Sequence, residues 1–296
     1  MGNILTKQFY RQRKDFEDSC AGRDAGLTFP EGVICSTDIA YADDGIKAHL
    51  LDIYRPEDSQ EKILPVIINV HGGGLIIGNK EFNRYFCALL CKKGFLVYSI
   101  EYRLIPDCLI YDQIADVFMA MDYIKERLAA DGGDSSHVYM AGDSGGACLI
   151  TYANAIQNST NIARAANVTP SGLRINALGL ISGMFYTSRF DKIGLFLPKY
   201  LYGRDYKKTP FAKYVNPENR ELLNSLAPVW LVTSHNDFLR RYTTDFEKAL
   251  TRAEREHELV VFPKNKKLTH AFSVFEPFLP ESSAVIDMMV EYLRKF

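Results

Sequence analysis

The chain has 296 residues, of which 47% are hydrophobic and 24% are charged, as in an ordinary globular protein. Lysine and arginine number 35 against 36 aspartates and glutamates, and this net charge of −1 gives no electrostatic reason to expect nucleic acid or an anionic membrane as a partner. No run of about 18 apolar residues occurs, so no membrane span is expected.

The first twenty residues bear on location and modification. They contain no apolar core of the length that a signal peptide needs, so we expect a cytoplasmic protein. Gly2 followed by Thr6 fits the myristoylation pattern only loosely, and an unmodified N-terminus is the favoured interpretation. Without an export signal, the six cysteines are expected to be reduced, and Cys87 and Cys148 lie in apolar runs typical of core residues. No cysteine or histidine cluster with metal-ligand spacing occurs, so no metal is expected.

The order of predicted elements indicates an α/β fold. A short helix over residues 5–19 precedes an antiparallel pair of strands between residues 33 and 54. The β-branched apolar run at 64–70 predicts a strand that is buried on both faces. Alternation then predicts helix 81–93, strand 95–102, helix 112–130, strand 137–142, helix 145–157, strand 177–182, and strands 228–234 and 258–263, each of these two followed by a helix. Such alternation is typical of a mostly parallel central sheet flanked by helices.

Residues 183–227 interrupt the alternation of strands and helices. They contain many aromatic side chains and no strand pattern. An insertion that caps the end of the sheet would have this composition, and so would a helical hairpin that covers the core. The cap is the favoured interpretation.

The sequence Gly142-Asp143-Ser144-Gly145-Gly146 matches G-x-S-x-G and lies between a predicted strand and a predicted helix, as this motif requires. A serine on such a turn has a strained backbone, and its hydroxyl projects at a helix N-terminus that favours negative charge. Trypsin-like proteases share the five letters but continue with proline on an all-β frame. Here a helix follows, Ala147-Cys148-Leu149, and the frame is α/β, which excludes that class.

Three glycines follow His71 directly after the buried strand at 64–70. Glycine lets the backbone N–H groups point outward, and such donors can hold the oxyanion of a tetrahedral intermediate. A phosphate-binding loop would instead end in Gly-Lys-Ser or Gly-Lys-Thr, which is absent at this point. His71 itself is interpreted as a residue that braces the loop.

A general base for Ser144 is expected late in the chain. His270 follows the last predicted strand, and Asp237 follows the strand at 228–234, so both belong to loops at the carboxyl edge of the sheet. His235 is the only serious rival base. Asp245 and Asp287 lie on helices and are interpreted as exposed carboxylates. The resulting order of Ser144, Asp237 and His270 is that of α/β-hydrolases.

With these residues, the chain resembles the hormone-sensitive-lipase-like α/β-hydrolases, the acetyl esterase and carboxylesterase group, over residues 45–296. The matching segments are His71 to Gly74, Tyr102-Arg103-Leu104-x-Pro106, the serine turn, Asp237-x-Leu239-Arg240 and His270-Ala271-Phe272. The resemblance implies one domain over 1–296, with cap elements from about 1–30 and 183–215. It also implies oxyanion donors at Gly73, Gly74 and Gly145, and hydrolysis of short-chain acyl esters without a cofactor.

Two positions depart from the pattern of this family. Asp107 stands where the family usually has glutamate, and Gly145 stands where it usually has alanine. The alternatives left open are an arylformamidase or peptidase on the same frame and a non-catalytic ligand receptor. The expected partner is a small-molecule ester, not a nucleic acid, and a homodimer is left open.

Overall fold

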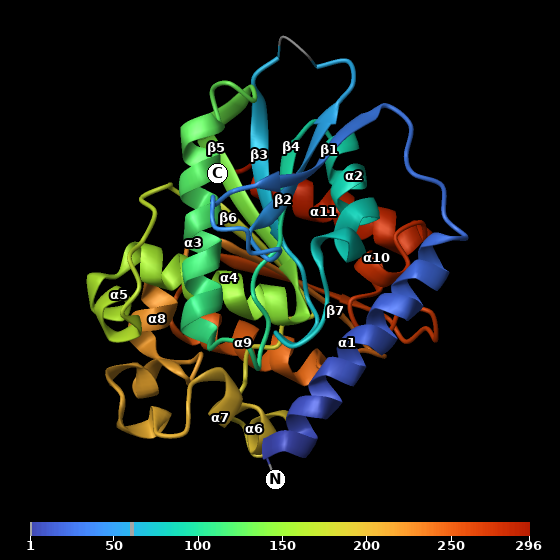
Figure 1. The fold of residues 1–296 in the computed structure, drawn as a ribbon. Helices are drawn as coiled ribbons and strands as arrows, with labels where there is room; N and C mark the ends of the chain where they lie inside the picture. Colours follow the sequence, from blue (N-terminus) through green and yellow to red (C-terminus); the bar gives the residue numbers. More distant parts are fainter. Residues whose placement is uncertain (1, 60–61) are drawn as a thin grey trace.

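The computed structural model describes residues 2–59 and 62–296, which contain one eight-stranded sheet (Figure 1). The strand order is β1-β2-β4-β3-β5-β6-β7-β8, with β2 antiparallel to β1 and β4 and every pair from β4 to β8 parallel. The strands are β1 Val33–Ala40, β2 Leu50–Pro56, β3 Leu64–Val70, β4 Leu96–Ile100, β5 Gly133–Asp143, β6 Ala177–Ile181, β7 Val229–Ser234 and β8 His257–Phe262. The prediction of a mostly parallel sheet flanked by helices is confirmed.

Helices cover both faces of the sheet. One layer contains α3 Ile110–Arg127, α4 Ser144–Asn158 and α9 Arg240–Arg252, and the other contains α2 Arg84–Lys92 and α11 Pro280–Leu293. Shorter elements are η1 Lys80–Asn83, α5 Thr160–Ala166 and α10 Phe272–Phe275. Helix α5 was not expected; it starts directly after α4, where the Ser159 side chain caps its first turn. None of the helices in the described residues combines the length and apolar content needed to cross a membrane.

Residues of the central strands alternate between two cores. In β3, Val66, Ile68 and Val70 pack with α3 and α4, whereas Ile67 packs with α2 and α11. Because both faces are buried, the strand is a largely apolar run and not an alternating one. The loops at the carboxyl ends of these strands all open at one edge of the sheet.

Helix α1 Gly2–Asp24 is longer than the predicted helix and lies across this carboxyl edge (Figure 1). Its half-buried side chains recur every three or four residues at Phe9, Arg13, Phe16, Cys20 and Arg23, so one face of the helix is turned to the protein. Met1 lies outside the described residues, and the interpretation of Gly2 as unmodified stays a prediction.

Arg13 attaches α1 to the rest of the molecule. Its guanidinium donates to the carbonyl oxygens of Ile76 (2.8 Å), Leu104 (3.0 Å) and Ile105 (2.6 Å). It also forms an ion pair with Asp107 (2.7 Å), which accepts a hydrogen bond from Tyr10 of the same helix. The aspartate that departs from the family pattern therefore anchors α1.

We predict that Arg13→Ala lowers the free energy of unfolding by roughly 2–4 kcal/mol, because three carbonyl groups and Asp107 lose a charged donor. Urea unfolding measures the change. Arg11→Ala is the matched control: this side chain is 83% exposed and forms an ion pair with Asp15, at 3.7 Å. Its loss should cost about 0.5 kcal/mol or less, and equal losses for the two variants would contradict the anchoring role.

The insertion after β6 contains α6 Lys192–Phe196, α7 Pro198–Leu201, η2 Tyr206–Lys208, η3 Pro210–Tyr214 and α8 Arg220–Asn224. Its aromatic side chains divide into two groups. Phe185, Tyr202 and Phe211 are buried in the core, whereas Phe190 and Phe196 are exposed. The insertion therefore covers part of the core and also contributes side chains to the surface above the sheet edge.

Candidate active site

Ser144 lies at the turn between β5 and α4. Its φ of +49° is left-handed, a conformation that residues other than glycine rarely adopt and that is typical of functional turns. A Cβ atom on Gly142 would lie 2.8 Å from the Val70 carbonyl oxygen, and one on Gly146 would collide with the same oxygen. The flanking glycines are therefore required by the close approach of β3, and the serine hydroxyl is left at the edge of the sheet.

His270 and Asp237 come together in the loops after β8 and β7. The Nδ1 atom of His270 donates to Oδ1 of Asp237 at 2.7 Å. Asp237 also accepts hydrogen bonds from the Leu239 backbone N–H and the Thr233 hydroxyl, each at 2.8 Å. Burial opposes ionisation of this carboxyl, but the hydrogen bonds from His270, Leu239 and Thr233 lower its pKa below 3.8. Asp237 is thus held as a carboxylate that orients the imidazole.

The rival residues lie elsewhere. His235 is exposed and its Nδ1 accepts from Arg240 at 2.8 Å. Asp245 pairs with Arg189 at 2.9 Å, and Asp287 pairs with Lys93 at 2.5 Å. None of these side chains lines the cavity that contains Ser144 and His270.

The glycine loop after β3 lies against the serine turn. Gly73 and Gly74 have φ values of +106° and +61°, and both line the cavity with Ser144. A Cβ atom on Gly145 would lie 2.9 Å from the amide nitrogen of Gly74. The backbones of the three glycines expected as oxyanion donors are thus adjacent.

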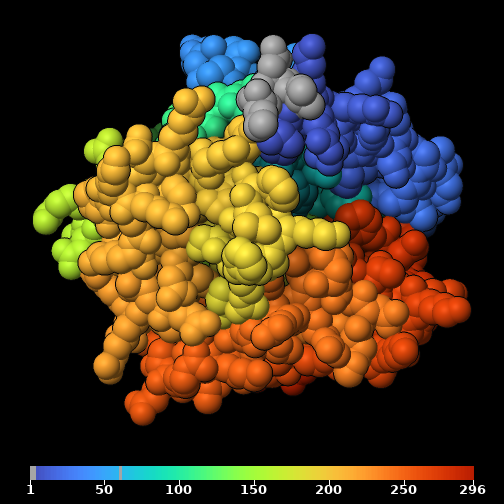
Figure 2. All heavy atoms as spheres, turned by 90° about the horizontal axis from the view of Figure 1, so that it is seen from below, coloured from blue at the N-terminus to red at the C-terminus, as the bar shows by residue number. Residues whose placement is uncertain are grey.

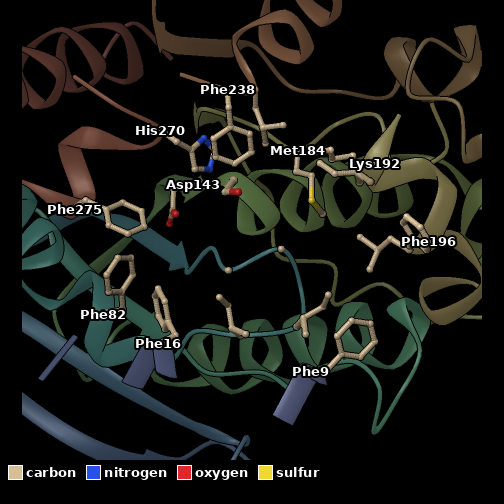
Figure 3. Close-up of a pocket in the computed structure, with 18 residues that line it drawn as sticks. Phe9, Phe16, Phe82, Asp143, Met184, Lys192, Phe196, Phe238, His270 and Phe275 are labelled. Atoms are coloured by element: carbon tan, nitrogen blue, oxygen red, sulfur yellow. The ribbon is translucent and has the colours of Figure 1, made fainter. Parts of the chain in front are cut away.

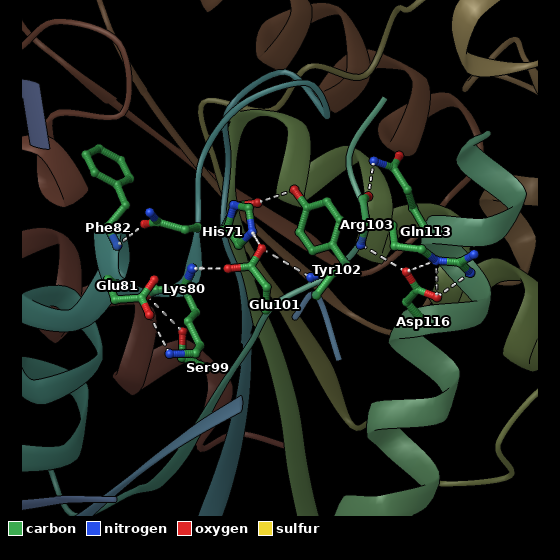
Figure 4. Close-up of polar contacts among 12 residues, drawn as sticks. His71, Lys80, Glu81, Phe82, Ser99, Glu101, Tyr102, Arg103, Gln113 and Asp116 are labelled. Atoms are coloured by element: carbon green, nitrogen blue, oxygen red, sulfur yellow. Dashed lines mark hydrogen bonds and ion pairs between the residues drawn. The ribbon is translucent and has the colours of Figure 1, made fainter. Parts of the chain in front are cut away.

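His71 lies behind this loop and is completely buried (Figure 4). It donates from Nδ1 to the Gly72 carbonyl oxygen (2.8 Å) and from Nε2 to Glu101 (2.9 Å), while Tyr102 stacks on its ring at 4.4 Å. Burial alone would lower the pKa of His71, but the Glu101 carboxylate and the Gly72 carbonyl raise it above 6.5. Both ring nitrogens of His71 therefore contact oxygen acceptors, and the side chain fixes the loop from behind.

Asp143, the residue before the serine, fixes the loop from the other side. Its Oδ1 accepts from the Gly72 backbone N–H and from the Asn83 side chain, both at 2.9 Å. Burial raises the pKa of Asp143 above 3.8 despite these donors. The carboxyl group therefore joins the serine turn, the glycine loop and the start of α2.

Asp143→Asn should change the dependence of stability on pH. Because the folded-state pKa is raised, ionisation costs stability as the pH rises from 3.8 through the folded pKa. The neutral asparagine lacks this cost, so the free energy of unfolding of the variant, relative to the wild type, should increase between pH 4 and pH 7. Urea unfolding at several pH values measures this, and parallel profiles would contradict it.

Sequence reasoning missed most of this support. Glu101 accepts from the backbone N–H of Lys80 at 2.9 Å, and the buried Lys80 ammonium pairs with Asp52 at 2.8 Å. Arg103 pairs with Asp116 at 2.6 Å (Figure 4). Two acidic residues were the available signal: Asp143 lies inside the serine motif, and Glu101 directly precedes Tyr102-Arg103-Leu104. The residues that they bind are distant in sequence, so the sequence does not identify these contacts.

The cavity above Ser144 has a volume of about 560 Å³ and a largely apolar lining (Figure 3). Phe16, Phe82 and Phe275 pack on one another, with ring centroids 4.8 and 4.7 Å apart, on the His270 side of the view. Phe9 of α1 and Phe196 of α6 lie on the other side. The described residues contain no cluster of three or more His, Cys, Asp or Glu side chains that could hold a metal ion.

Comparisons with known proteins agree with the fold. A family model described as the alpha/beta hydrolase fold matches residues 67–273. A probable isoprenylcysteine alpha-carbonyl methylesterase of Oryza sativa subsp. japonica is 29% identical over 184 residues, which cover 58% of this chain and 44% of the relative. Esterase LipQ of Mycobacterium tuberculosis is 33% identical over 120 residues, which cover 40% and 28%. The chain thus spans less than half the length of these curated relatives.

Solved structures resemble the whole chain. Esterase B from Lactobacillus rhamnosis is 22% identical, with a TM-score of 0.92 and coverage of 100% of this chain and 96% of that one. A bacterial heroin esterase is 22% identical, with a TM-score of 0.72 and coverage of 98% and 92%. At this identity the likeness shows the fold alone.

Proposed function

The chain belongs to the α/β-hydrolase family whose model spans residues 67–273, and from this premise we propose that it is a serine carboxylic-ester hydrolase. One observation carries the proposal. Ser144, on a strained turn, shares an apolar cavity with His270, whose Nδ1 is bound to the buried Asp237. A nucleophile, a base and an acid that orients the base are thus present together. The esterases among the relatives and structural neighbours support the same reaction class.

In the proposed mechanism, Nε2 of His270 takes the proton of the Ser144 hydroxyl while Oγ attacks the ester carbonyl carbon. The amides of Gly73, Gly74 and Gly145 hold the oxyanion. Collapse breaks the bond to the alcohol oxygen, which leaves with the proton from His270, and Ser144 keeps the acyl group. Water then attacks this acyl-enzyme by the same steps and releases the carboxylic acid. Asp237 stabilises the imidazolium throughout.

The proposed substrates are short-chain, acetyl-type esters. The close packing of Phe16, Phe82 and Phe275 on the His270 side supports a small apolar acyl site. One structure of esterase B contains a tributyrin phosphonate, which supports a short acyl chain by analogy. A cytoplasmic location stays part of the proposal; it is supported by Cys87, Cys91 and Cys148, which are buried as small core residues.

A chain-length series of p-nitrophenyl esters tests this function, assayed beside N-formylkynurenine and an aminoacyl arylamide. We expect turnover to be greatest for acetate to butyrate and to fall for octanoate. Faster hydrolysis of the formamide or the arylamide would replace the esterase proposal with one of the alternatives on the same frame.

A further inference from the structure

The net charge of −1 hides a strong separation of charge along the chain. Residues 183–215 contain seven lysines and arginines but two aspartates, and residues 2–14 contain four basic residues and no acidic one. These two segments carry a net charge of +9, so the rest of the chain carries −10. The net charge gave no electrostatic reason to expect an anionic partner. That inference therefore does not hold for every face of the protein.

The two basic segments meet at the mouth of the cavity. Phe9 of α1 and Lys192 of α6 line the same cavity, and the ring of Phe9 contacts Tyr200 with centroids 5.2 Å apart. Figure 2 views the molecule from this side and shows residues near 190–200, in yellow, between the blue α1 and the orange residues near 240. We call residues 5–14, residues 189–200 and Phe238 the mouth surface.

Several cations of the mouth surface lack acidic partners. Lys7 and Lys14 on α1, Lys192 on α6 and Lys199 on α7 are exposed. No carboxylate forms an ion pair with any of these four within residues 2–59 and 62–296. Their charge is therefore available to an external anion.

Large apolar side chains project among these cations. Phe190 is 91% exposed, Phe238 74%, Phe196 58% and Leu195 56%. Helix α6 buries none of its own residues. Exposed aromatic and aliphatic side chains gathered at one site mark an interaction surface.

We propose that the mouth surface docks on an anionic lipid surface. Protruding phenylalanines and leucine would enter the boundary between headgroups and acyl chains, while the lysines would lie among anionic headgroups. A nucleic acid would satisfy the lysines but would leave Leu195 and the apolar cavity mouth without a partner. If the proposed esterase function holds, docking also places the mouth of the cavity against the lipid surface. An apolar ester dissolved in the lipid then enters the cavity directly.

Sedimentation with phospholipid vesicles tests the docking, and the Ser144→Ala variant removes any contribution from catalysis. Vesicles of phosphatidylcholine with about one third phosphatidylglycerol should bind the protein, and pure phosphatidylcholine should bind it at least tenfold more weakly. Added salt should weaken the binding, because it screens the lysines. Equal binding to both vesicles, no binding to either, or a preference for a single-stranded oligonucleotide over anionic vesicles would overturn the proposal.

Two pairs of variants locate the surface. The double change Phe190→Ser and Leu195→Ser should weaken vesicle binding at least tenfold, whereas Ile63→Ser should not; Ile63 is 75% exposed and precedes β3 at the opposite edge of the sheet. Lys7→Gln with Lys199→Gln should weaken binding roughly fivefold per lysine, as expected near an anionic surface. The control, Lys62→Gln with Lys125→Gln, lies at the far edge and should have no effect.

Equal losses in the test and control pairs would overturn the assignment of this surface. Near-ultraviolet circular dichroism of each variant reports folding independently of activity. If the wild type binds anionic vesicles but hydrolyses no ester, the esterase proposal fails and the docking proposal stands. If it hydrolyses soluble esters but ignores vesicles, the reverse holds.

Discussion

Asp237→Asn should lower kcat for p-nitrophenyl acetate about 10⁴-fold and leave the fold intact. Asp237 accepts a hydrogen bond from Nδ1 of His270 at 2.7 Å, and this bond leaves Nε2 unprotonated to receive the serine proton. An asparagine that donates through its amide would favour the opposite tautomer, with Nε2 protonated. It would also remove the charge that stabilises the imidazolium. Stopped-flow or steady-state kinetics at neutral pH measures the loss.

Asp245→Asn is the control for this variant. Asp245 is the nearest acidic residue in sequence on α9, and it pairs with Arg189, outside the cavity lining. Its replacement should change kcat less than about twofold. A near-normal kcat for Asp237→Asn, or an equal loss for Asp245→Asn, would contradict the proposed role of Asp237.

Gly73→Ala should lower kcat about 10²- to 10³-fold, the usual loss for an oxyanion donor. Gly73 has a φ of +106°, and a Cβ atom there would collide with the carbonyl oxygen of Ile77. The loop must shift to relieve this collision. The amides proposed to hold the oxyanion then no longer point at the oxyanion. The effect should fall mainly on kcat, because the oxyanion forms only in the transition state.

The control for Gly73→Ala must be a glycine that also has a positive φ, but at which an added Cβ atom collides with nothing. Gly32 has a φ of +78°, and a Cβ atom there would have no neighbour within 4 Å. Gly32→Ala should cost about 1 kcal/mol of stability and leave kcat unchanged. If both variants keep full activity, the glycine loop does not supply the oxyanion donors.

The sheet could be predicted from sequence because its strands are buried on both faces. Burial of this kind makes the runs at 64–70 and 228–234 largely apolar, and these runs are β3 and β7 within one residue at either end. The loops after parallel strands open at one edge, so the approach of Asp237 to His270 was implied by their positions alone.

The support of the site could not be predicted in the same way. Glu101 reaches His71 across 30 positions, and Arg13 reaches the carbonyl group of Ile76 across 63. Such contacts depend on which side chains meet after folding, and no local periodicity encodes them. Asp107 is an example. The sequence marks it only as a departure from a family pattern, and the ion pair with Arg13 of α1 is seen only in the structure.

The mouth surface was missed for another reason. A total charge adds all faces of the molecule together, so a basic face and an acidic remainder cancel. The aromatic residues of 183–227 were equally ambiguous, since Phe211 is buried in the core and Phe190 is exposed. Composition alone cannot separate these two roles, because both favour the same residue types.

Covalent labelling of Ser144 with a fluorophosphonate tests the central claim most directly, because the reagent requires an activated serine and resembles the tetrahedral intermediate. We expect one label per chain, found by mass spectrometry on the peptide that contains Ser144. Ser144→Ala should abolish both the label and ester turnover, and His270→Ala should slow labelling strongly. A label on another serine, or full ester turnover by Ser144→Ala, would contradict the assignment of the nucleophile.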